Sequence, residues 1–439
     1  MNKITFKMKN FIKPLTIVGA LCYTIGAFAQ DETEFVPKVK NVTTPACVLY
    51  AKDYEGPSST HTSPEVLNRM ASGTACTNFI VNYTGFTGPE GAQAMAAFQF
   101  AVDIWANSIE SSQPIRINAS FEPLGPGVLG QAGPTTVLTS NHPDATPNVF
   151  YPVALWEKIE DQDSSGFGSI DINATFSSSF NWYYGTDAMP PGSQFDFVTV
   201  VLHELGHGLG FISFATTDGS TGRLREPNNM IPTVYDLNVE NGMGQSLLDS
   251  GLFTDPSNDM HLQLTGSNLF NNSPTSVGQN GGVIPRMFAP SPWDQGSSYS
   301  HWDESTFPNG NVNSLMTPQI GSGVANHNPG PISLGLFEDM GWSICGGSLT
   351  VDEFTVDTVE ISPNPFTSSI AIKLSNGAND DYTVNLFDIN GRVVMSETLT
   401  ATNGNLTLSN LDKLGDALYF VKITNDFSGS SITKKVIKN

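Results

Sequence analysis

The stretch "DFVTVVLHELGHGLGF", residues 196–211, decides the fold of the larger part of this chain. Asp196 opens it, and Asp is a favoured residue at a helix N-cap. Apolar residues then recur at three- and four-residue steps, as on one face of an amphipathic helix; they are Val198, Val201, Leu202, Leu205 and Leu209. His203 and His207 lie four positions apart and share the other face. The stretch therefore predicts a helix with one core-facing side and two imidazoles on the other.

Two histidines at this spacing can point both imidazoles at one metal ion. Glu204 is one position round from His203. From there its carboxylate can reach a water bound to the metal without being a ligand. A catalytic zinc usually takes three protein ligands and keeps one position open. The pattern therefore predicts a zinc site that needs one more ligand from elsewhere in the chain.

Several positions compete for the third ligand. The compact form of the motif places it six residues after the second histidine, where this chain has Ser213, a poor ligand for zinc. Glu226 has the spacing of a ligand on a second helix, but Gly and Pro residues interrupt the stretch 220–237, which should not be helical. A distant histidine remains, and His301 and His261 are the candidates.

Four motifs make the comparison with a known family specific: "HELGHGLGF" (203–211), "SHWDE" (300–304), "SLMTP" (314–318) and "LGLFEDMGW" (334–342). Together they resemble the metzincin peptidases of the leishmanolysin type. The resemblance covers roughly residues 76–345. It implies an α+β, metzincin-like zincin domain with a twisted sheet, an active-site helix and a C-terminal helix. It also implies a long insertion, here residues 211–300, between the helix and the third ligand.

The resemblance assigns roles to individual residues of this sequence. It implies zinc ligation by His203, His207 and His301, general-base catalysis by Glu204, a turn at Gly210 and a floor beneath the metal at Met316. Glycine suits a sharp turn at a helix end because it tolerates the left-handed conformation. His261 is the rival third ligand, but no comparable Met-containing turn follows it.

These residues predict a secreted zinc metalloendopeptidase that uses one catalytic Zn²⁺. In the expected reaction, Glu204 activates a zinc-bound water that attacks a peptide bond of a protein or peptide substrate. The alternative is a cell-surface or adhesion-type binding protein whose zinc site is structural or inactive. An intact Glu204 favours the enzyme, because an inert site needs no general base.

The N-terminus has the features of a secretory signal peptide over residues 1–29. Four lysines precede a short apolar run, and "AFA" at 27–29 fits a small-x-small cleavage site. Residues 30–75 are polar and weakly periodic, which indicates an N-terminal extension or pro-segment. We therefore expect an exported protein, secreted or at the cell surface by a Gram-negative outer-membrane route, with no membrane span in its mature form.

Residues 76–345 show the periodicities of an α+β domain. Strands are predicted at 78–86, 114–124 and 169–176, and helices at 88–109 and 332–342. The stretch 125–134 is rich in Gly and Pro, and no strand or helix is assigned to it from the sequence; the insertion 211–300 reads as rich in loops.

The remaining sequence changes to short alternating runs. We expect a linker at 346–356 and a small all-β sandwich at 357–439, with Asn390-Gly391 as a hairpin turn. "ISPNPFTSSIAIKL", "VNLFDINGRVV", "ALYFVKIT" and the closing "KKVIKN" resemble the C-terminal sorting domains of Bacteroidetes proteins exported by type IX secretion. The resemblance implies the type IX machinery as a partner. The alternative is an ordinary immunoglobulin-like adhesion or sugar-binding module.

The net charge indicates which partners the chain can bind, and the cysteine content indicates which disulfides it can form. The net charge is −22, and loss of the four lysines of the signal peptide gives −22 − 4 = −26. So acidic a chain repels phosphate backbones, and nucleic acid is not expected as a partner. Cys47, Cys76 and Cys345 remain in an oxidising compartment, where an odd count leaves one unpaired. We expect a Cys47–Cys76 disulfide, with an inhibitory zinc-binding thiolate at one of these two as the alternative.

Overall fold

The computed structural model describes residues 42, 47–54, 56–162, 170–347, 359–374, 381–388, 392–402, 404–425 and 431–439. Two large hydrophobic cores form within them and share no residue. One lies in residues 47–347, here called the first domain, and the other in residues 359–439, here called the C-terminal domain. Most of the predicted linker, 346–356, lies outside the described residues, as does the predicted signal peptide.

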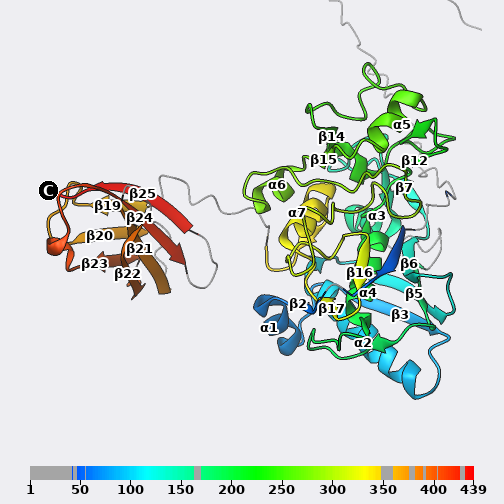
Figure 1. The fold of residues 1–439 in the computed structure, drawn as a ribbon, viewed down its shortest axis with the longest axis horizontal. Helices are drawn as coiled ribbons and strands as arrows, with labels where there is room; N and C mark the ends of the chain where they lie inside the picture. The colour runs from blue at the N-terminus through cyan, green and yellow to red at the C-terminus, as the bar shows by residue number, and fades with distance from the viewer. Residues whose placement is uncertain are drawn as a thin grey trace, which may run out of the picture. The chain divides into compact units, whose positions relative to one another are not determined.

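A six-stranded sheet with the order β16-β1-β6-β9-β5-β3 forms the frame of the first domain (Figure 1). Its strands are β1 (Cys47–Lys52), β3 (Phe79–Thr84), β5 (Ile115–Glu122), β6 (Val128–Pro134), β9 (Ile172–Ser177) and β16 (Gln319–Gly321). β3, β5 and β9 run parallel, β6 is antiparallel to β9, β1 is antiparallel to β6, and β16 is parallel to β1. The strands predicted at 78–86, 114–124 and 169–176 are confirmed.

Two strands of this sheet differ from expectation. β6 falls in the Gly/Pro-rich stretch 125–134, to which no strand is assigned from the sequence. Its small residues hide the strand pattern, but they let α4 pack closely on it: a Cβ at Gly130 would lie 3.0 Å from Cγ of Glu204. β1 falls in the stretch 30–75, and its buried Cys47 and Leu49 alternate with half-buried neighbours. Part of the predicted extension is therefore a strand of the main sheet.

Helices α2 (Gly88–Ala106) and α4 (Phe197–Leu209) pack against each other, and α4 also contacts β6 and β9. Trp105 of α2 joins the two helices, because its indole N–H donates to the Leu202 carbonyl at 3.0 Å. The same ring meets Phe337 of α7 (Pro331–Met340) edge to face. The predicted helices at 88–109 and 332–342 are thus confirmed, and the three helices share one core.

Short elements complete the first domain, and several of them lie in the insertion 211–300. They are β2 (Ser58–Thr60), α1 (Pro64–Ser72), β4 (Ile109–Glu110), β7 (Val137–Thr139), β8 (Phe150–Pro152), α3 (Val153–Glu160), β10 (Trp182–Tyr183), β11 (Phe195–Asp196), β12 (Thr216–Thr217), β13 (Gly222–Arg223), η1 (Val234–Asn238), β14 (Val239–Asn241), α5 (Asn258–Leu264), β15 (Leu269–Asn271), α6 (Pro274–Gln279), β17 (Val324–Asn326) and β18 (Ser343–Ile344). No helix in the described part of the chain is long and apolar enough to cross a membrane.

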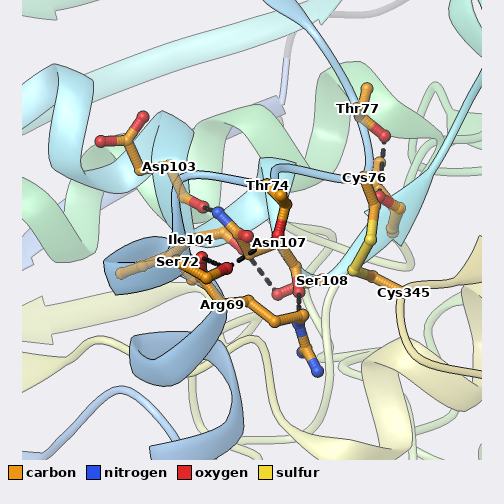
Figure 2. The surroundings of a disulfide bond; sticks show 11 residues. Arg69, Ser72, Thr74, Cys76, Thr77, Asp103, Ile104, Asn107, Ser108 and Cys345 are labelled. Carbon is orange, nitrogen blue, oxygen red and sulfur yellow. Dashed lines mark hydrogen bonds between the residues drawn. A yellow bond between two sulfur atoms is a disulfide. The ribbon is translucent and has the colours of Figure 1, made fainter.

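A disulfide joins Cys76 to Cys345, so the expected Cys47–Cys76 pair is wrong (Figure 2). The reason is the topology: β18 pairs with β4 and brings the end of the first domain back to its beginning, next to Cys76. Cys47 lies on β1, where it is free and buried. The two bridged cysteines are 269 positions apart in the sequence.

The described residues of the C-terminal domain form seven strands, which agrees with the expected all-β pattern. They are β19 (Val359–Ser362), β20 (Ile370–Leu374), β21 (Asp381–Phe387), β22 (Val393–Thr400), β23 (Asn405–Leu408), β24 (Leu418–Asn425) and β25 (Ser431–Ile437), with η2 (Leu411–Lys413) between two of them. One sheet has the order β19-β20-β23 and the other β22-β21-β24-β25. The predicted turn at Asn390-Gly391 lies outside the described residues.

Candidate metal centre

The helix α4 begins and ends as its sequence predicts. The carboxylate of Asp196 accepts a hydrogen bond from the backbone N–H of Thr199 at 2.7 Å, which is the N-cap interaction. Gly210 follows the helix with φ +137°, a conformation that favours glycine. The chain therefore turns immediately after the helix, and the carbonyl of Phe211 comes to face the ring of His207.

Three imidazoles converge at this helix. The Nε2 atoms of His203 and His207 lie 3.0 Å apart, and Nε2 of His301 lies 3.2 Å from each of them. All three side chains are fully buried. Within the described part of the chain, they form the one group of potential ligands whose atoms gather within 4.8 Å of one another. The structure thus brings together the three residues predicted as zinc ligands.

The second nitrogen of each ring fixes its tautomer. Nδ1 of His203 lies 2.7 Å from the Leu315 carbonyl oxygen, Nδ1 of His207 lies 2.7 Å from that of Phe211, and Nδ1 of His301 lies 2.6 Å from that of Ser297. A carbonyl can only accept, so each Nδ1 carries the proton and donates it. Each Nε2 then presents a lone pair to the centre of the group.

Burial keeps the three rings neutral. It lowers the pKa of His203 to about 4, and it lowers the pKa of His207 and of His301 well below the usual range. Three unprotonated nitrogens at 3.0 to 3.2 Å have no hydrogen to share, so they would repel one another without a cation between them. Tetrahedral zinc with N–Zn bonds of ~2.0–2.1 Å places its ligand nitrogens about 3.3 Å apart. The donor set therefore fits zinc in both chemistry and spacing.

Glu204 lies beside the three histidines without joining them. Its carboxyl group is fully buried, and Oε1 accepts a hydrogen bond from the backbone N–H of Leu49 at 3.2 Å. Oε2 has no hydrogen-bond partner among the described residues. Burial raises the pKa of Glu204 well above its usual value, while the backbone groups of Leu49 and Ala132 oppose the shift. A carboxyl group with one free oxygen and a raised pKa is suited to accept and return a proton.

Met316 is buried and lies against the helix at Gly206. A Cβ at Gly206 would meet its sulfur at 2.7 Å, so glycine at this position lets the methionine side chain pack closely on the helix. The segment at Met316 is held to the residue after His301, because the N–H of Trp302 donates a hydrogen bond to the Met316 carbonyl at 2.8 Å. Because the neighbouring carbonyl of Leu315 holds the ring of His203, the turn at Met316 connects two of the three ligands.

The rival third ligands have other partners. His261 lies on α5 with its Nδ1 2.7 Å from the hydroxyl of Thr217. The carboxylate of Glu226 accepts hydrogen bonds from Asn228 and Asn229 in its own turn. Ser213 uses its hydroxyl to accept from the Ala215 N–H at 3.0 Å. None of these side chains belongs to the group at His301.

The other histidines also lie apart from this group. His61 is exposed, and His142 is partly exposed beside Asp144. His327 is buried and its Nε2 lies 2.7 Å from Oδ1 of Asp196, the N-cap of the active-site helix. His327 thus contacts the residue that caps the start of α4.

Cys47 lies near the centre but is not part of the ligand group. Burial, with a smaller contribution from the charge of Glu204, raises the pKa of the Cys47 thiol to about 12. Cys76 is bonded to Cys345. The sulfur of Cys47 is not among the atoms that gather at His203, His207 and His301, so the arrangement does not support the inhibitory thiolate considered from the sequence.

The C-terminal domain matches a known family. Residues 360–439 match the family model of the secretion system C-terminal sorting domain. The chain therefore carries a type IX sorting domain, which interacts with the type IX machinery and indicates export to the cell surface or beyond in Bacteroidetes. Residues 92–219, which include most of α2 and all of α4, match a family model described as SPBPB7E8-like.

Solved structures are similar to parts of the chain only. An immunoglobulin-like β-sandwich protein of Bacteroides vulgatus is 17% identical, with a TM-score of 0.16, and covers 19% of this chain and 84% of its own. PorZ, a surface component of the type IX secretion system of Porphyromonas gingivalis, is 17% identical, with a TM-score of 0.17, and covers 20% of this chain and 12% of its own. Such TM-scores do not define the fold of the chain as a whole. No curated protein matches the chain.

Proposed function

We propose that residues 76–345 are a leishmanolysin-like metzincin, a secreted zinc metalloendopeptidase. The single observation that carries the proposal is the meeting of three neutral Nε2 atoms beside a buried carboxyl group that is not one of the ligands. Three nitrogen ligands leave a fourth position open, as in catalytic zinc sites, whereas structural sites close all four. The match of residues 92–219 to a family model lends no activity to the chain, so the proposal rests on the site.

The roles of the residues follow from their geometry. When bound, zinc polarises a peptide carbonyl and lowers the pKa of a nearby water towards ~7. Glu204 accepts the proton of the attacking water on its free oxygen and then donates it to the leaving amine. The Nδ1 bonds to backbone carbonyls hold the rings of His203, His207 and His301 in the orientation and tautomer that the ion requires.

The alternative is a cell-surface binding protein whose zinc site is structural or inactive. It predicts zinc without hydrolysis. The test is cleavage of a casein substrate by the purified protein with and without a chelator, and after re-addition of zinc. Glu204→Gln is the matched variant, because it keeps the size and the buried position of the side chain but cannot act as a base.

The proposed function predicts a loss of at least ~100-fold in rate for Glu204→Gln, with one zinc per chain retained. Cleavage that survives the chelator would refute the proposal. So would a zinc-loaded Glu204→Gln variant that remains as active as the unaltered protein.

A further inference from the structure

Trp302 follows His301 directly in the chain and is fully buried. Its backbone forms an antiparallel β-bridge with Met287. Its side chain is fixed as well, because the indole N–H donates to the hydroxyl oxygen of Ser333 on α7 at 3.0 Å. The proposed catalytic steps make no use of Trp302, although its backbone and its ring are both held in place next to a proposed ligand.

The indole ring of Trp302 packs on Phe211, the residue that follows the turn at Gly210. The two ring centroids lie 5.1 Å apart, and the rings meet edge to face. The carbonyl of Phe211 accepts the hydrogen bond from Nδ1 of His207 at 2.7 Å. Because the ring and the carbonyl belong to one residue, the position of Trp302 restricts the acceptor that orients His207.

The backbone N–H of Trp302 bonds to the segment that orients His203. It donates to the Met316 carbonyl at 2.8 Å. The preceding carbonyl, that of Leu315, accepts the hydrogen bond from Nδ1 of His203 at 2.7 Å. Each peptide unit is planar, so only the two backbone dihedrals of Met316 separate these carbonyls. The bond from Trp302 therefore restricts the acceptor of His203 as well.

Trp302 is thus connected to all three histidines: to one by the chain itself, and to the other two through the residues whose carbonyls orient them. A shift of an acceptor carbonyl turns the ring that donates to it, and so moves the lone pair of Nε2 away from the ion. Groups that orient metal-ligating histidines typically change metal affinity by roughly 10- to 100-fold when they are replaced.

We propose that Trp302 is a positioning residue of the metal centre: it sets the spacing of the three Nε2 atoms and ties that spacing to α7 through Ser333. The proposal rests on the proposed function, because it takes the three histidines as ligands of one zinc ion. It adds a residue from outside the ligand set, whose replacement should alter the metal geometry while all three histidines remain in the chain.

The first experiment measures zinc affinity by competition with a chelator of known affinity. Trp302→Phe keeps an aromatic ring at the position but removes the indole N–H that fixes the orientation of the ring. Trp156→Phe is the matched control, because Trp156 is also buried in the first domain and its indole N–H also donates to an oxygen, the carbonyl of Thr139 in β7 at 3.1 Å. Urea unfolding of the zinc-free chains shows how much stability each variant loses.

We expect Trp302→Phe to bind zinc at least ~10-fold more weakly than the unaltered chain, and Trp156→Phe to bind it within ~2-fold of the unaltered chain. Equal zinc affinities of the two variants would overturn the proposal and make Trp302 an ordinary core residue. If the unaltered chain binds no zinc, the proposed function itself fails.

Cobalt(II) in place of zinc reports the ligand geometry, because its visible absorption is strong in a tetrahedral site and weakens as the site is distorted. Cobalt-loaded Trp302→Phe should show a weaker and shifted band, and cobalt-loaded Trp156→Phe the band of the unaltered chain. A loss of stability alone does not move the band of molecules that remain folded and loaded. An unchanged band in Trp302→Phe would therefore refute the positioning role even if its zinc affinity were lower.

Ser333→Ala tests the link to α7 and leaves the indole ring in place, so it serves even if Trp302→Phe does not fold. It removes the acceptor of the indole N–H and should weaken zinc binding in the same direction as Trp302→Phe. In the double variant the two losses should not add, because each substitution breaks the same hydrogen bond. Zinc affinity unchanged in Ser333→Ala, or fully additive losses in the double variant, would show that this bond does not fix the metal geometry, and the proposal would be wrong.

Discussion

The disulfide between Cys76 and Cys345 should contribute a large part of the stability of the first domain. It closes a loop of 269 residues. The chain-entropy relation for such a loop gives about 5 to 6 kcal/mol of destabilisation of the unfolded state at 25 °C. Single domains are stable by only ~5–15 kcal/mol in total. We therefore expect the double variant Cys76→Ser/Cys345→Ser to lie near the limit of folding at 37 °C.

Tryptophan fluorescence allows this loss to be measured in the first domain alone. All six tryptophans lie between residues 105 and 342, and the C-terminal domain has none. Urea unfolding at 15 °C, where the variant has more stability in reserve, should give a free energy of unfolding lower by about 5 kcal/mol. The matched control is Cys47→Ala, which removes a buried free thiol but no crosslink and should cost about 1 kcal/mol.

A thiol count tests the pairing directly. A chain without residues 1–29, denatured in the absence of reductant, should react at one thiol, that of Cys47. Three reactive thiols would refute the bridge. A loss of less than ~1 kcal/mol in the double variant, with the bridge intact in the parent, would refute the entropic reasoning.

Three further predictions concern the site and its surroundings. His301→Ala should lose stoichiometric zinc and activity, whereas His261→Ala should retain both, as measured by metal analysis; zinc retained by His301→Ala would remove it from the ligand set. Gly206→Ala should destabilise the domain by roughly 1–3 kcal/mol in urea unfolding, because its methyl group would lie 2.7 Å from the sulfur of Met316, and an unchanged midpoint would contradict this packing. Burial raises the pKa of Asp236 from 3.8 to about 6. The protonated form is therefore favoured in the folded state, and its contribution of roughly 3 kcal/mol is present below about pH 4 and lost as the pH rises to about 6. Relative to the parent, Asp236→Asn should unfold with less dependence on pH between 4 and 6, and parallel pH curves would show that the shift is absent.

The parts of the site that depend on local sequence could be predicted. His203, Glu204 and His207 share one helix, so their relative positions follow from helical geometry alone. The N-cap at Asp196 and the turn at Gly210 are equally local, and both are present in the structure. A sequence pattern of a few residues is enough to predict such positions, because residues that are close in the sequence are here also close in space.

The strands beside Glu204 could not be predicted in this way. β6 is rich in glycine because α4 approaches it closely at Gly130, and this removes the apolar alternation by which strands are recognised. β1 is separated from Glu204 by 155 positions, and its place depends on pairing with β6 and β16, which no local pattern encodes. The disulfide was missed for the same reason, since sequence order says nothing of which cysteines meet.

His301, the proposed third ligand, shows how a residue distant in sequence comes to lie beside the two histidines of α4. Backbone hydrogen bonds join His301 to the insertion. The N–H of Tyr299 donates to the carbonyl of Phe288 at 2.7 Å, and the N–H of Phe288 donates to the carbonyl of His301 at 2.9 Å. The hydroxyl of Tyr235, from early in the insertion, donates to the Tyr299 carbonyl at 2.9 Å. The insertion thus packs on itself around His301, whose Nε2 lies 3.2 Å from Nε2 of His203 and of His207. Metal affinity should therefore respond to substitutions in the insertion that touch no ligand.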